Sequence, residues 1–381
     1  MNSFEIGKMV KQPKGFKAFV PSPFPPSKKI ELPNSLMEKH TDAIHLLGKL
    51  DGVTQLLPDK DWFLLMFLRK DAASSSQIEG TRATILDAIE AENAEPRRGL
   101  PSDVDDIVHY IAASDYGLKR SEELPFSLRF ICELHEILMM DARSTQFPYP
   151  GEFRTSQNWI DGTRPDNARF VPPPADEIPR ALGDLEKFVH TADGFLPLVK
   201  AGLLHAQFET IHPFTDGNGR TGRLLVTMYL WNQRLLSMPI LYLSSFFKKH
   251  QDVYYERLDG YHSGKVLEWL DFFFEGVCVI ADSAITTCID ISILRTGDMQ
   301  KIQALGKTSA ASTMIILENL YKMPVIGIAD VIKWTGFTPT GGYKVINRLV
   351  EMGILEPMGE SDKYAKKWVY KSYLDLFTKD I

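Results

Sequence analysis

The residues best suited to chemistry stand close together in one polar stretch, HPFTDGNGRTGR, which runs from His212 to Arg223. Apolar helical patterns lead into it and out of it, so it is expected to be a tight loop between two core helices. Gly217 and Gly219 allow a bent backbone whose N–H groups can point the same way. Because the loop opens the next helix, unpaired N–H groups and the helix dipole favour an anion there. The spacing therefore predicts a phosphate cradle.

Four side chains of the stretch would complement such a cradle. Arg220 and Arg223, three residues apart, are expected to share a helix face and to reach the same anion. Asp216 offers a hard oxygen for a Mg²⁺ ion that bridges phosphates, and His212 is a base that can be neutral near pH 7. Any one of these residues alone would be explained as well by a capped helix junction. Their joint occurrence predicts phosphoryl or nucleotidyl transfer, in which catalysis is mainly positioning and charge stabilisation.

This stretch resembles the signature of the Fic family, HPFxDGNGRxxR, and matches it at every specified position. The resemblance covers roughly residues 35–290. It implies transfer of AMP from ATP, with Mg²⁺, to a Ser, Thr or Tyr hydroxyl of a target protein or of the enzyme itself, and relatives often form homodimers. By position, His212 would be the base and Asp216 the Mg²⁺ ligand. The residues implied to hold the nucleotide are Gly217, Asn218, Gly219, Arg220, Thr221, Gly222, Arg223 and, at the adenine pocket, Lys249.

A second motif lies upstream, where Ser75-Ser76-Gln77-Ile78-Glu79-Gly80 resembles the inhibitory motif of the Fic family. A carboxylate at Glu79 that pairs with Arg223 would occupy the seat of the γ-phosphate, so that ATP would bind unproductively. A Glu at a helix end, before a capping glycine, is common without any such role. In company with the signature, Ser75 and Glu79 are interpreted as inhibitory residues.

The elements that must position these residues are mostly helical. Residues 1–33, rich in Pro and Lys, are expected to form an extended arm that lies on another part of the protein. The Asp161-Gly162 pair predicts a β-hairpin over 157–170, where the Fic family has a flap that contacts the target segment. Apolar residues recur at helical spacing over 35–57, 59–78, 82–91, 103–118 and 126–140, and again from 177 to about 287.

The stretch after residue 300 has a different pattern. A helix over 312–321 is followed by a second helix, a tight turn at Gly336 and a third helix over 341–352, and short segments near 353–357 and 367–370 could form a wing. The fold class is therefore mainly α: a Fic-type helical core with a β-hairpin flap, plus a C-terminal winged helix-turn-helix unit. The predicted units are 1–100, the arm and the helices that include the inhibitory helix; 101–290, the catalytic core; and 300–381, the winged helix.

Composition indicates the cellular compartment and argues against nucleic acid or a membrane as a general partner. The formal net charge is −6, so the chain as a whole is not a polybasic nucleic-acid binder. The three cysteines have no CxxC spacing, and they are expected to be buried thiols in a reducing compartment. The N-terminal stretch lacks the apolar region of a secretory signal, and no apolar run approaches the ~20 residues that span a bilayer. A cytoplasmic protein without membrane contact is expected.

Two alternative functions stay open. In the first, the chain is a transcriptional regulator whose C-terminal unit binds DNA while the helical body senses a nucleotide. The residues from Thr308 to Ile381 include nine Lys and Arg and eight Asp and Glu, which is little positive charge for a DNA-binding face. A module for binding proteins or for dimerisation would suit that unit as well. In the second alternative, a Fic-type site transfers another phosphate-linked group or removes AMP.

Overall fold

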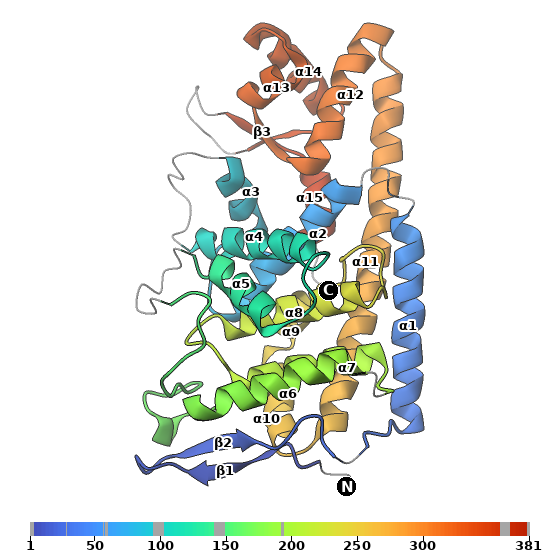
Figure 1. The fold of residues 1–381 in the computed structure, drawn as a ribbon. Coiled ribbons are helices and arrows are strands. Elements are labelled where there is room, and N and C mark those ends of the chain that lie inside the picture. Colours follow the sequence, from blue (N-terminus) through green and yellow to red (C-terminus); the bar gives the residue numbers. More distant parts are fainter. Residues whose placement is uncertain are drawn as a thin grey trace.

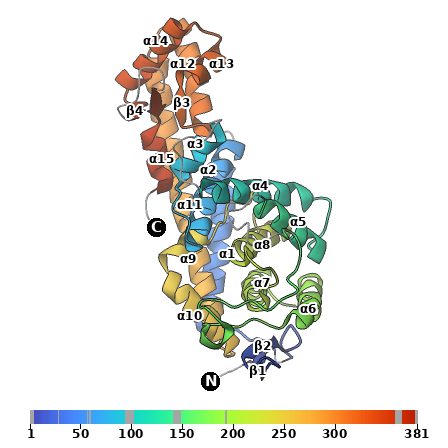
Figure 2. The ribbon, with the colours of Figure 1, turned by 90° about the vertical axis from the view of Figure 1, so that its left-hand side faces the viewer.

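The structure, a computed structural model, describes residues 4–27, 29–55, 57, 60–93, 103–140, 149–191, 194–358 and 366–378. These residues are mainly helical, as predicted, and the molecule is elongated (Figure 1). Figure 2 shows a helical body beside one long helix, α11 (Val266–Gln303). The C-terminal unit stands at one end of that helix, and the N-terminal strands lie at the opposite end of the molecule.

Two helices form the centre of the body, α7 (Pro197–Ile211) and α8 (Asn218–Asn232). Every residue of α7 after Pro197 is buried, so this helix is enclosed around its whole circumference. The two helices pack on each other. The link between them, residues 212–217, is therefore anchored at both ends in the core.

The surrounding helices begin and end within a few residues of the positions that helical periodicity predicts. Three of them, α2, α4 and α5, pack on α8, while α6 and α10 pack on α7 and α1 lies along α11. Their bounds are α1 (Asn34–Thr54), α2 (Lys60–Ile78), α3 (Ile85–Asn93), α4 (Val104–Arg120), α5 (Leu128–Leu138), α6 (Ile178–His190), α9 (Ser244–Lys249) and α10 (Gln251–His262).

The N-terminal arm is extended, as expected, but it is also paired with itself. Strands β1 (Gly7–Lys11) and β2 (Lys17–Pro21) form an antiparallel hairpin, with Gly15 at φ 97° in the turn. The N–H of Phe19 donates to the carbonyl of Val171, which joins this hairpin to the chain just before α6. The arm lacks the Asn-Gly or Asp-Gly turn that usually signals a hairpin, so its sequence gave no indication of the pairing.

The segment 157–170, predicted as a β-hairpin, folds back on itself through a single bridge between Ile160 and Phe170. Throughout these residues, all of which the structure describes, no extended strand forms. A short 3₁₀ turn, η1 (Pro165–Asn167), fills the loop, and a second, η2 (Ala175–Glu177), precedes α6. Asp161 and Gly162 have φ values of 56° and 76°, the pair of left-handed residues that an Asp-Gly turn supplies.

The C-terminal unit follows α11 without a break in the helix, because α11 runs through residues 290–300, where the sequence suggests a boundary. Three strands of this unit form an antiparallel sheet in the order β3-β5-β4. The first of these strands was not predicted. The elements are α12 (Lys307–Lys322), β3 (Val325–Gly327), α13 (Ile328–Thr335), α14 (Pro339–Glu351), β4 (Glu356–Met358), β5 (Lys367–Val369) and α15 (Lys371–Thr378).

The C-terminal unit is packed on the first half of α2. Arg69 of α2 is 2% exposed and donates to the carbonyl of Lys322 at the end of α12 (2.9 Å), and it also pairs with Glu92 of α3. On the same helix, Phe67 meets Phe377 of α15 edge to face, at 5.2 Å between ring centroids. The first half of α2 is therefore clamped between the body and the C-terminal unit.

By length and composition, α11 is apolar enough to cross a membrane, and the expectation that no segment reaches that length is wrong. A core helix of a soluble protein can be equally long and apolar. The helix packs against α1, α7, α10 and α12. These contacts account for its apolar composition.

Arg69→Met should lower the free energy of unfolding by about 3 kcal/mol, because it removes one partner of a buried ion pair and leaves Glu92 and a carbonyl without their donor. The measurement is urea unfolding at neutral pH. Arg257→Met, at a partly exposed arginine of α10, is the matched control and should change stability by no more than about 0.5 kcal/mol. A loss at Arg69 as small as that of the control would contradict this account of the clamp.

Candidate active site

The polar loop begins where α7 ends, at a strained residue. His212 has φ 49° and ψ 60°, a left-handed conformation that costs a residue with a side chain on the order of 1–3 kcal/mol. Gly217, at φ 74°, makes the second sharp bend and precedes α8. Asn218 ties the two bends together, because its Oδ1 accepts from the N–H of Phe214 (2.8 Å) and its Nδ2 donates to the carbonyl of Phe214 (2.9 Å).

A buried arginine outside the motif supports this bend. Arg154 is 5% exposed, and its guanidinium donates to the carbonyls of His212 (2.9 Å) and Pro173 (2.6 Å). Burial lowers the pKa of Arg154 to about 10, so it stays charged at neutral pH. It therefore holds His212 in its unusual backbone conformation and joins the loop to the chain before α6.

A buried histidine of α5 fixes the other side of the loop. The N–H of Gly151 donates to His135 Nδ1 (2.9 Å), so Nε2 carries the proton and donates to the carbonyl of Asp216 (2.9 Å). The His135 ring stacks on Phe214 with 3.6 Å between centroids. Burial lowers the pKa of His135 to about 4 and keeps the ring neutral.

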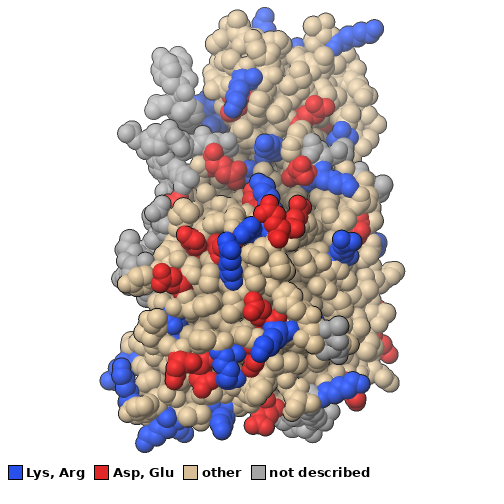
Figure 3. All heavy atoms as spheres, in the orientation of Figure 1, with Lys and Arg blue, Asp and Glu red and all other residues tan. Residues whose placement is uncertain are grey.

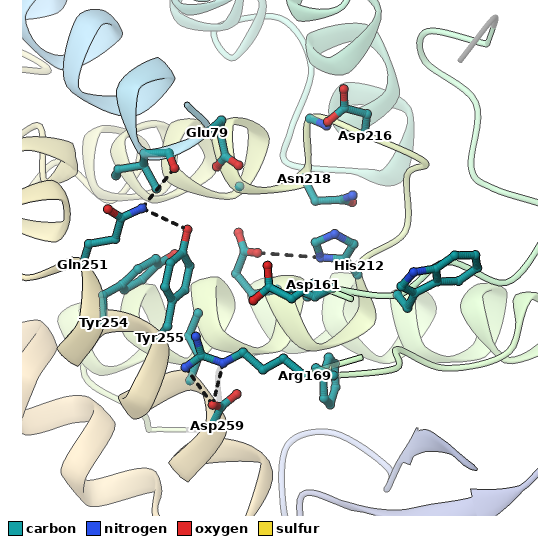
Figure 4. A pocket seen from close by; sticks show the side chains of 18 of the residues that line it. Glu79, Asp161, Arg169, His212, Asp216, Asn218, Gln251, Tyr254, Tyr255 and Asp259 are labelled. Atoms are coloured by element: carbon teal, nitrogen blue, oxygen red, sulfur yellow. Dashed lines mark hydrogen bonds and ion pairs between the residues drawn. The ribbon is translucent and has the colours of Figure 1, made fainter. Parts of the chain in front are cut away.

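These supports shape one side of a cavity of about 690 Å³. Figure 4 shows Glu79, Asp216, Asn218 and His212 around it, with Tyr254 and Tyr255 of α10 on the opposite wall. The folded segment 157–170 forms its rim through residues that include Asp161 and Arg169. The cavity therefore combines the end of α2, the start of α8, the polar loop and α10.

A partly buried ion pair in the cavity joins the two sequence motifs. Arg223 is 4% exposed, and its Nη2 lies 2.8 Å from Oε1 of Glu79. Arg223 also donates from Nε to the hydroxyl of Ser75 (2.9 Å) and from Nη2 to the Ser75 carbonyl (3.0 Å). Burial alone would lower the pKa of Arg223, but the charge of Glu79 and other neighbours raises it above its ordinary value.

Glu79 lies directly over the start of α8. A Cβ atom added to Gly219 would stand 2.2 Å from Glu79 Oε1, so the glycine makes room for a carboxylate at the helix N-terminus. That end of the helix is where unpaired N–H groups and the helix dipole attract an anion. The Glu79 carboxylate therefore occupies the position that an anionic group of a ligand would take.

The structure brings most of the predicted site residues together, but not all. His212, Asp216, Gly217, Asn218 and Gly219 line the cavity, and Arg223 and Glu79 meet inside it. Ser75 does not line the cavity and acts on it only through Arg223.

Arg220 does not share the anion site with Arg223, contrary to prediction. Its guanidinium lies 3.2 Å from Asp106 of α4 and contacts the sulfur of Met139. Residues three apart on a helix point in directions about 60° apart around the axis, which is enough to send two long side chains to different neighbours. Arg220 therefore joins α8 to α4.

The other nucleotide residues implied by the resemblance also lie outside the cavity lining. Thr221 donates to the carbonyl of Gly217 (2.8 Å) and closes the first turn of α8. Gly222 faces α7, where a Cβ would stand 2.6 Å from Glu209 Oε1. Lys249 lines a separate hollow on another face of α2, beside Lys70 and Ser74. The cavity wall on that side begins two residues later, at Gln251.

Several cavity residues had no signal in the sequence. Arg169 forms an ion pair with Asp259 (2.8 Å) and lies over the ring of Tyr255, 5.2 Å from its centroid. His262 stacks on Phe170 at 3.9 Å between centroids. These partners are far apart in the chain and follow no local pattern, so only the fold reveals them.

The candidate base, His212, is partly enclosed. Its side chain is 18% exposed. Burial and the nearby positive charge of Arg154 lower the pKa of His212 to about 4. The imidazole is therefore neutral at pH 7 and has a nitrogen lone pair with which to take a proton.

Comparison with known proteins gives consistent results. The model of the Fic/DOC family matches residues 125–230, and the model of the Fic/DOC family N-terminal region matches residues 37–119. A probable protein adenylyltransferase of Aquifex aeolicus is 30% identical over 193 residues, which are 49% of this chain and 54% of that protein. A protein adenylyltransferase Fic of Aedes aegypti is 32% identical over 124 residues, which are 32% of this chain and 22% of that protein.

The chain thus spans about half, or less, of the length of these curated relatives. A solved structure of a Fic family protein from Desulfovibrio desulfuricans G20 has the same fold over most of both chains. The match covers 90% of this chain and 97% of that one, with a TM-score of 0.59 and 19% sequence identity. At that identity, the likeness shows the fold alone.

The buried histidines should make the protein sensitive to acid. Burial lowers the pKa of His135 and His212 to about 4 and that of His205 and His262 to about 3, whereas histidines of an unfolded chain titrate near 6.5. Between these values the unfolded state binds more protons. The free energy of unfolding should therefore fall as the pH drops from about 6.5 towards 4, and these groups should not affect it above about pH 7.

Urea unfolding at about pH 7.5 and pH 5 measures this loss. His205→Gln removes one titrating group from α7 and should make the difference between the two pH values smaller. His45→Gln, at an exposed position of α1, is the control and should keep the difference of the unmodified protein. A difference that is the same with and without His205 would show that this ring does not contribute.

Proposed function

Because the chain belongs to the Fic/DOC family, we propose that it transfers AMP from ATP to a Ser, Thr or Tyr hydroxyl of a protein and releases pyrophosphate. One observation carries the proposal: a neutral histidine and an anion site at a helix N-terminus open on the same cavity. Transfer of a nucleotidyl group needs both, since the phosphates must be held while the incoming hydroxyl loses its proton.

The start of α8 would hold the phosphates. The backbone from Gly217 to Gly219 presents the N–H groups of the first turn, and the Asn218 contacts keep that backbone bent. Arg223 adds a buried guanidinium suited to an outer phosphate. The aromatic pair Tyr254 and Tyr255 forms an apolar wall on the far side, suited to the adenosine part of ATP.

Asp216 would hold Mg²⁺ together with the phosphates. Across the described residues, no group of three or more His, Cys, Asp or Glu side chains could form a metal site by itself. Asp216 lies at the loop that would hold the phosphates, and one such carboxylate fits Mg²⁺, which commonly binds one or two carboxylates plus the substrate's phosphate oxygens. When bound, the ion would neutralise phosphate charge.

His212 would act as the base. Its imidazole takes the proton of the target hydroxyl, so the O–H bond breaks and an N–H bond forms. The hydroxyl oxygen then forms a bond to the α-phosphorus, and the bond from that phosphorus to the pyrophosphate oxygen breaks. Arg223 and the N-terminus of α8 stabilise the negative charge that gathers on the leaving phosphates.

The segment 157–170 would act as a flap for the target. It lies on the cavity rim, where the Ile160–Phe170 bridge holds its two ends together. A target segment could add to the backbone beside this bridge as a further strand, and main-chain contacts of that kind would position its hydroxyl without reading much of its sequence.

The Glu79–Arg223 pair would keep the enzyme inhibited. An outer phosphate and the Glu79 carboxylate compete for the same guanidinium and the same helix N-terminus. With Glu79 in place, ATP can bind only in a shifted position that turns its α-phosphate away from the line of attack. Removal of Glu79 would restore the productive position.

The C-terminal unit has the order of elements of a winged helix, with α13 and α14 as its helix-turn-helix and β4–β5 as its wing. Charge does not favour a DNA-binding regulator. On the face drawn in Figure 3, Lys and Arg alternate with Asp and Glu, and no broad basic patch covers that face. A role in binding protein, including a second copy of this chain, fits this surface better.

Loss of the base tests the proposal directly. In a Glu79→Gly background, His212→Ala should lower AMP transfer to the protein itself about 10²- to 10⁴-fold, while ATP affinity changes little, because the imidazole acts on the hydroxyl and does not hold the phosphates. Mass spectrometry after incubation with ATP and Mg²⁺ detects the added AMP, and calorimetry measures ATP binding. Products other than AMP on the protein would support transfer of another group. An unchanged rate would remove His212 from the mechanism.

The inhibitory role gives a second prediction. Glu79→Gly should raise AMP incorporation by about tenfold or more, with a larger effect on turnover than on ATP affinity. Glu122→Gly, at an exposed glutamate far from the cavity, is a control and should have no effect on transfer. Adding Arg223→Ala to Glu79→Gly should cancel the gain, since the phosphate then lacks its cation. Equal incorporation with and without Glu79 would show that Glu79 is only a helix-end residue.

A further inference from the structure

A buried acid of α7 lies beside the base. Glu209, three residues before His212, lines the same cavity and is 8% exposed. Its Oε2 is 3.8 Å from His212 Nδ1. Although both are buried, Glu209 Oε1 and His212 Nδ1 have no hydrogen-bond partner within the described part of the chain. Hydrogen bonds of catalytic groups are often long before substrate binds and shorten in the working complex.

The backbone explains why these groups face each other. The left-handed turn at His212 brings its ring back over the last turn of α7, so Nδ1 points towards residue 209. From the other side, α8 leaves space for the acid only because residue 222 is glycine, since a Cβ there would stand 2.6 Å from Glu209 Oε1. The α7–α8 contact thus holds a carboxyl group next to the base.

We propose that the Glu209 carboxyl is a positioning residue for His212, accepting a hydrogen bond from Nδ1–H and so leaving Nε2 free to take the proton of the target hydroxyl. The inference rests on the AMP transfer proposed above. In the reaction, the hydroxyl proton moves to Nε2, the O–H electron pair forms the bond to the α-phosphorus, and the pyrophosphate oxygen leaves with its own pair. The Nδ1 proton stays in its bond to Glu209 throughout.

The surroundings set the charge of both groups. The backbone of Glu209 raises the pKa of the His212 ring, but the lowering by burial is larger, so the ring stays neutral. Burial raises the pKa of Glu209 to about 8, so the acid is mostly neutral at pH 7 and accepts through its carbonyl oxygen. As His212 gains a proton, the carbonyl oxygen of the Glu209 carboxyl keeps the hydrogen bond from Nδ1–H, and this acceptor stabilises the imidazolium.

Other charged and titratable groups surround the pair, and each contributes to its titration. Those that act on Glu209 are Arg223 of α8, Glu79 after α2 and Tyr254 of α10, and those that act on His212 are Arg154, Glu79, Asp216 and His262. Because the pKa values of Glu209 and His212 depend on all these groups, the experiments compare variants at residue 209 under one set of conditions.

The first test reads the tautomer and needs no AMP transfer. Ring ¹⁵N shifts in NMR spectra distinguish Nδ1–H from Nε2–H, and His212→Ala identifies the signals of this ring. We expect mainly Nδ1–H in the unmodified protein and in Glu209→Gln, whose amide oxygen can still accept, and a mixture in Glu209→Met, which has similar length and no acceptor. A proton mainly on Nε2 in the unmodified protein, or an unchanged tautomer in Glu209→Met, would overturn the inference.

The second test is kinetic, in the Glu79→Gly background. Glu209→Met should lower kcat about 10- to 100-fold, part of what a general base contributes, with the KM for ATP unchanged. Glu209→Gln should recover most of the rate at pH 7. Glu256→Met, at an exposed position of α10, is the matched control and should act at the parent rate. Full activity of Glu209→Met, or a change in KM alone, would refute a positioning role.

The two tests separate this inference from the proposed function. If the parent enzyme transfers no AMP, the function fails, and the NMR result still decides whether Glu209 orients the ring. If transfer occurs and the ring keeps its tautomer without the acid, the function stands and the inference fails.

Discussion

The site depends on one buried cation. Arg223 cannot remain in the interior without an anionic or polar partner, because an unpaired buried charge costs several kcal/mol, on the order of 3–5. Ser75 supplies its hydroxyl and carbonyl, and Glu79 supplies the carboxylate. These contacts fix the end of α2 against α8. Whatever displaces the Glu79 carboxylate must bring an anion of its own, so ligand binding in this cavity is an exchange of anions around one guanidinium.

That exchange involves a helix held at both ends. Arg69 and Phe67 attach the first half of α2 to α12 and α15, while Ser75 and Glu79 attach its second end to Arg223. The end of α2 therefore cannot shift as a whole without disturbing contacts of the C-terminal unit. The Glu79 side chain is more mobile in principle, since it is 38% exposed and has its own rotamers. A carboxylate that swings away while its helix stays in place is the simplest way to free the anion site.

The sequence predicted the part of the site that lies within one short segment of the chain. His212 to Gly219 could be recognised because one short loop holds the base, the carboxylate and the glycines, and their spacing fixes their geometry. The supports of the loop could not be predicted, since Arg154 and His135 act from other segments. The same reason explains two placements that the motif does not show: Arg220 pairs with Asp106 of α4, and Lys249 lines a separate hollow. Helices were predicted well because burial repeats along them, whereas the pairing of β1 with β2 depends on contacts that no local pattern shows.

The chemistry around the base depends on how little charge His212 and Glu209 themselves carry at neutral pH. Burial keeps His212 neutral and raises the pKa of Glu209 to about 8, so a base and an acid stand together without a net charge between them at pH 7. Charge develops on this pair only when the proton of the target hydroxyl moves to His212, and the Glu209 carboxyl then accepts a hydrogen bond from the charged ring. The anion site and the base thus have separate functions. The anion site exchanges the Glu79 carboxylate for a phosphate of the ligand, whereas His212 becomes charged only during transfer. In a low-dielectric site this arrangement is favourable, because the charge that develops on His212 has the Glu209 carboxyl beside it, and the phosphate charge has Arg223.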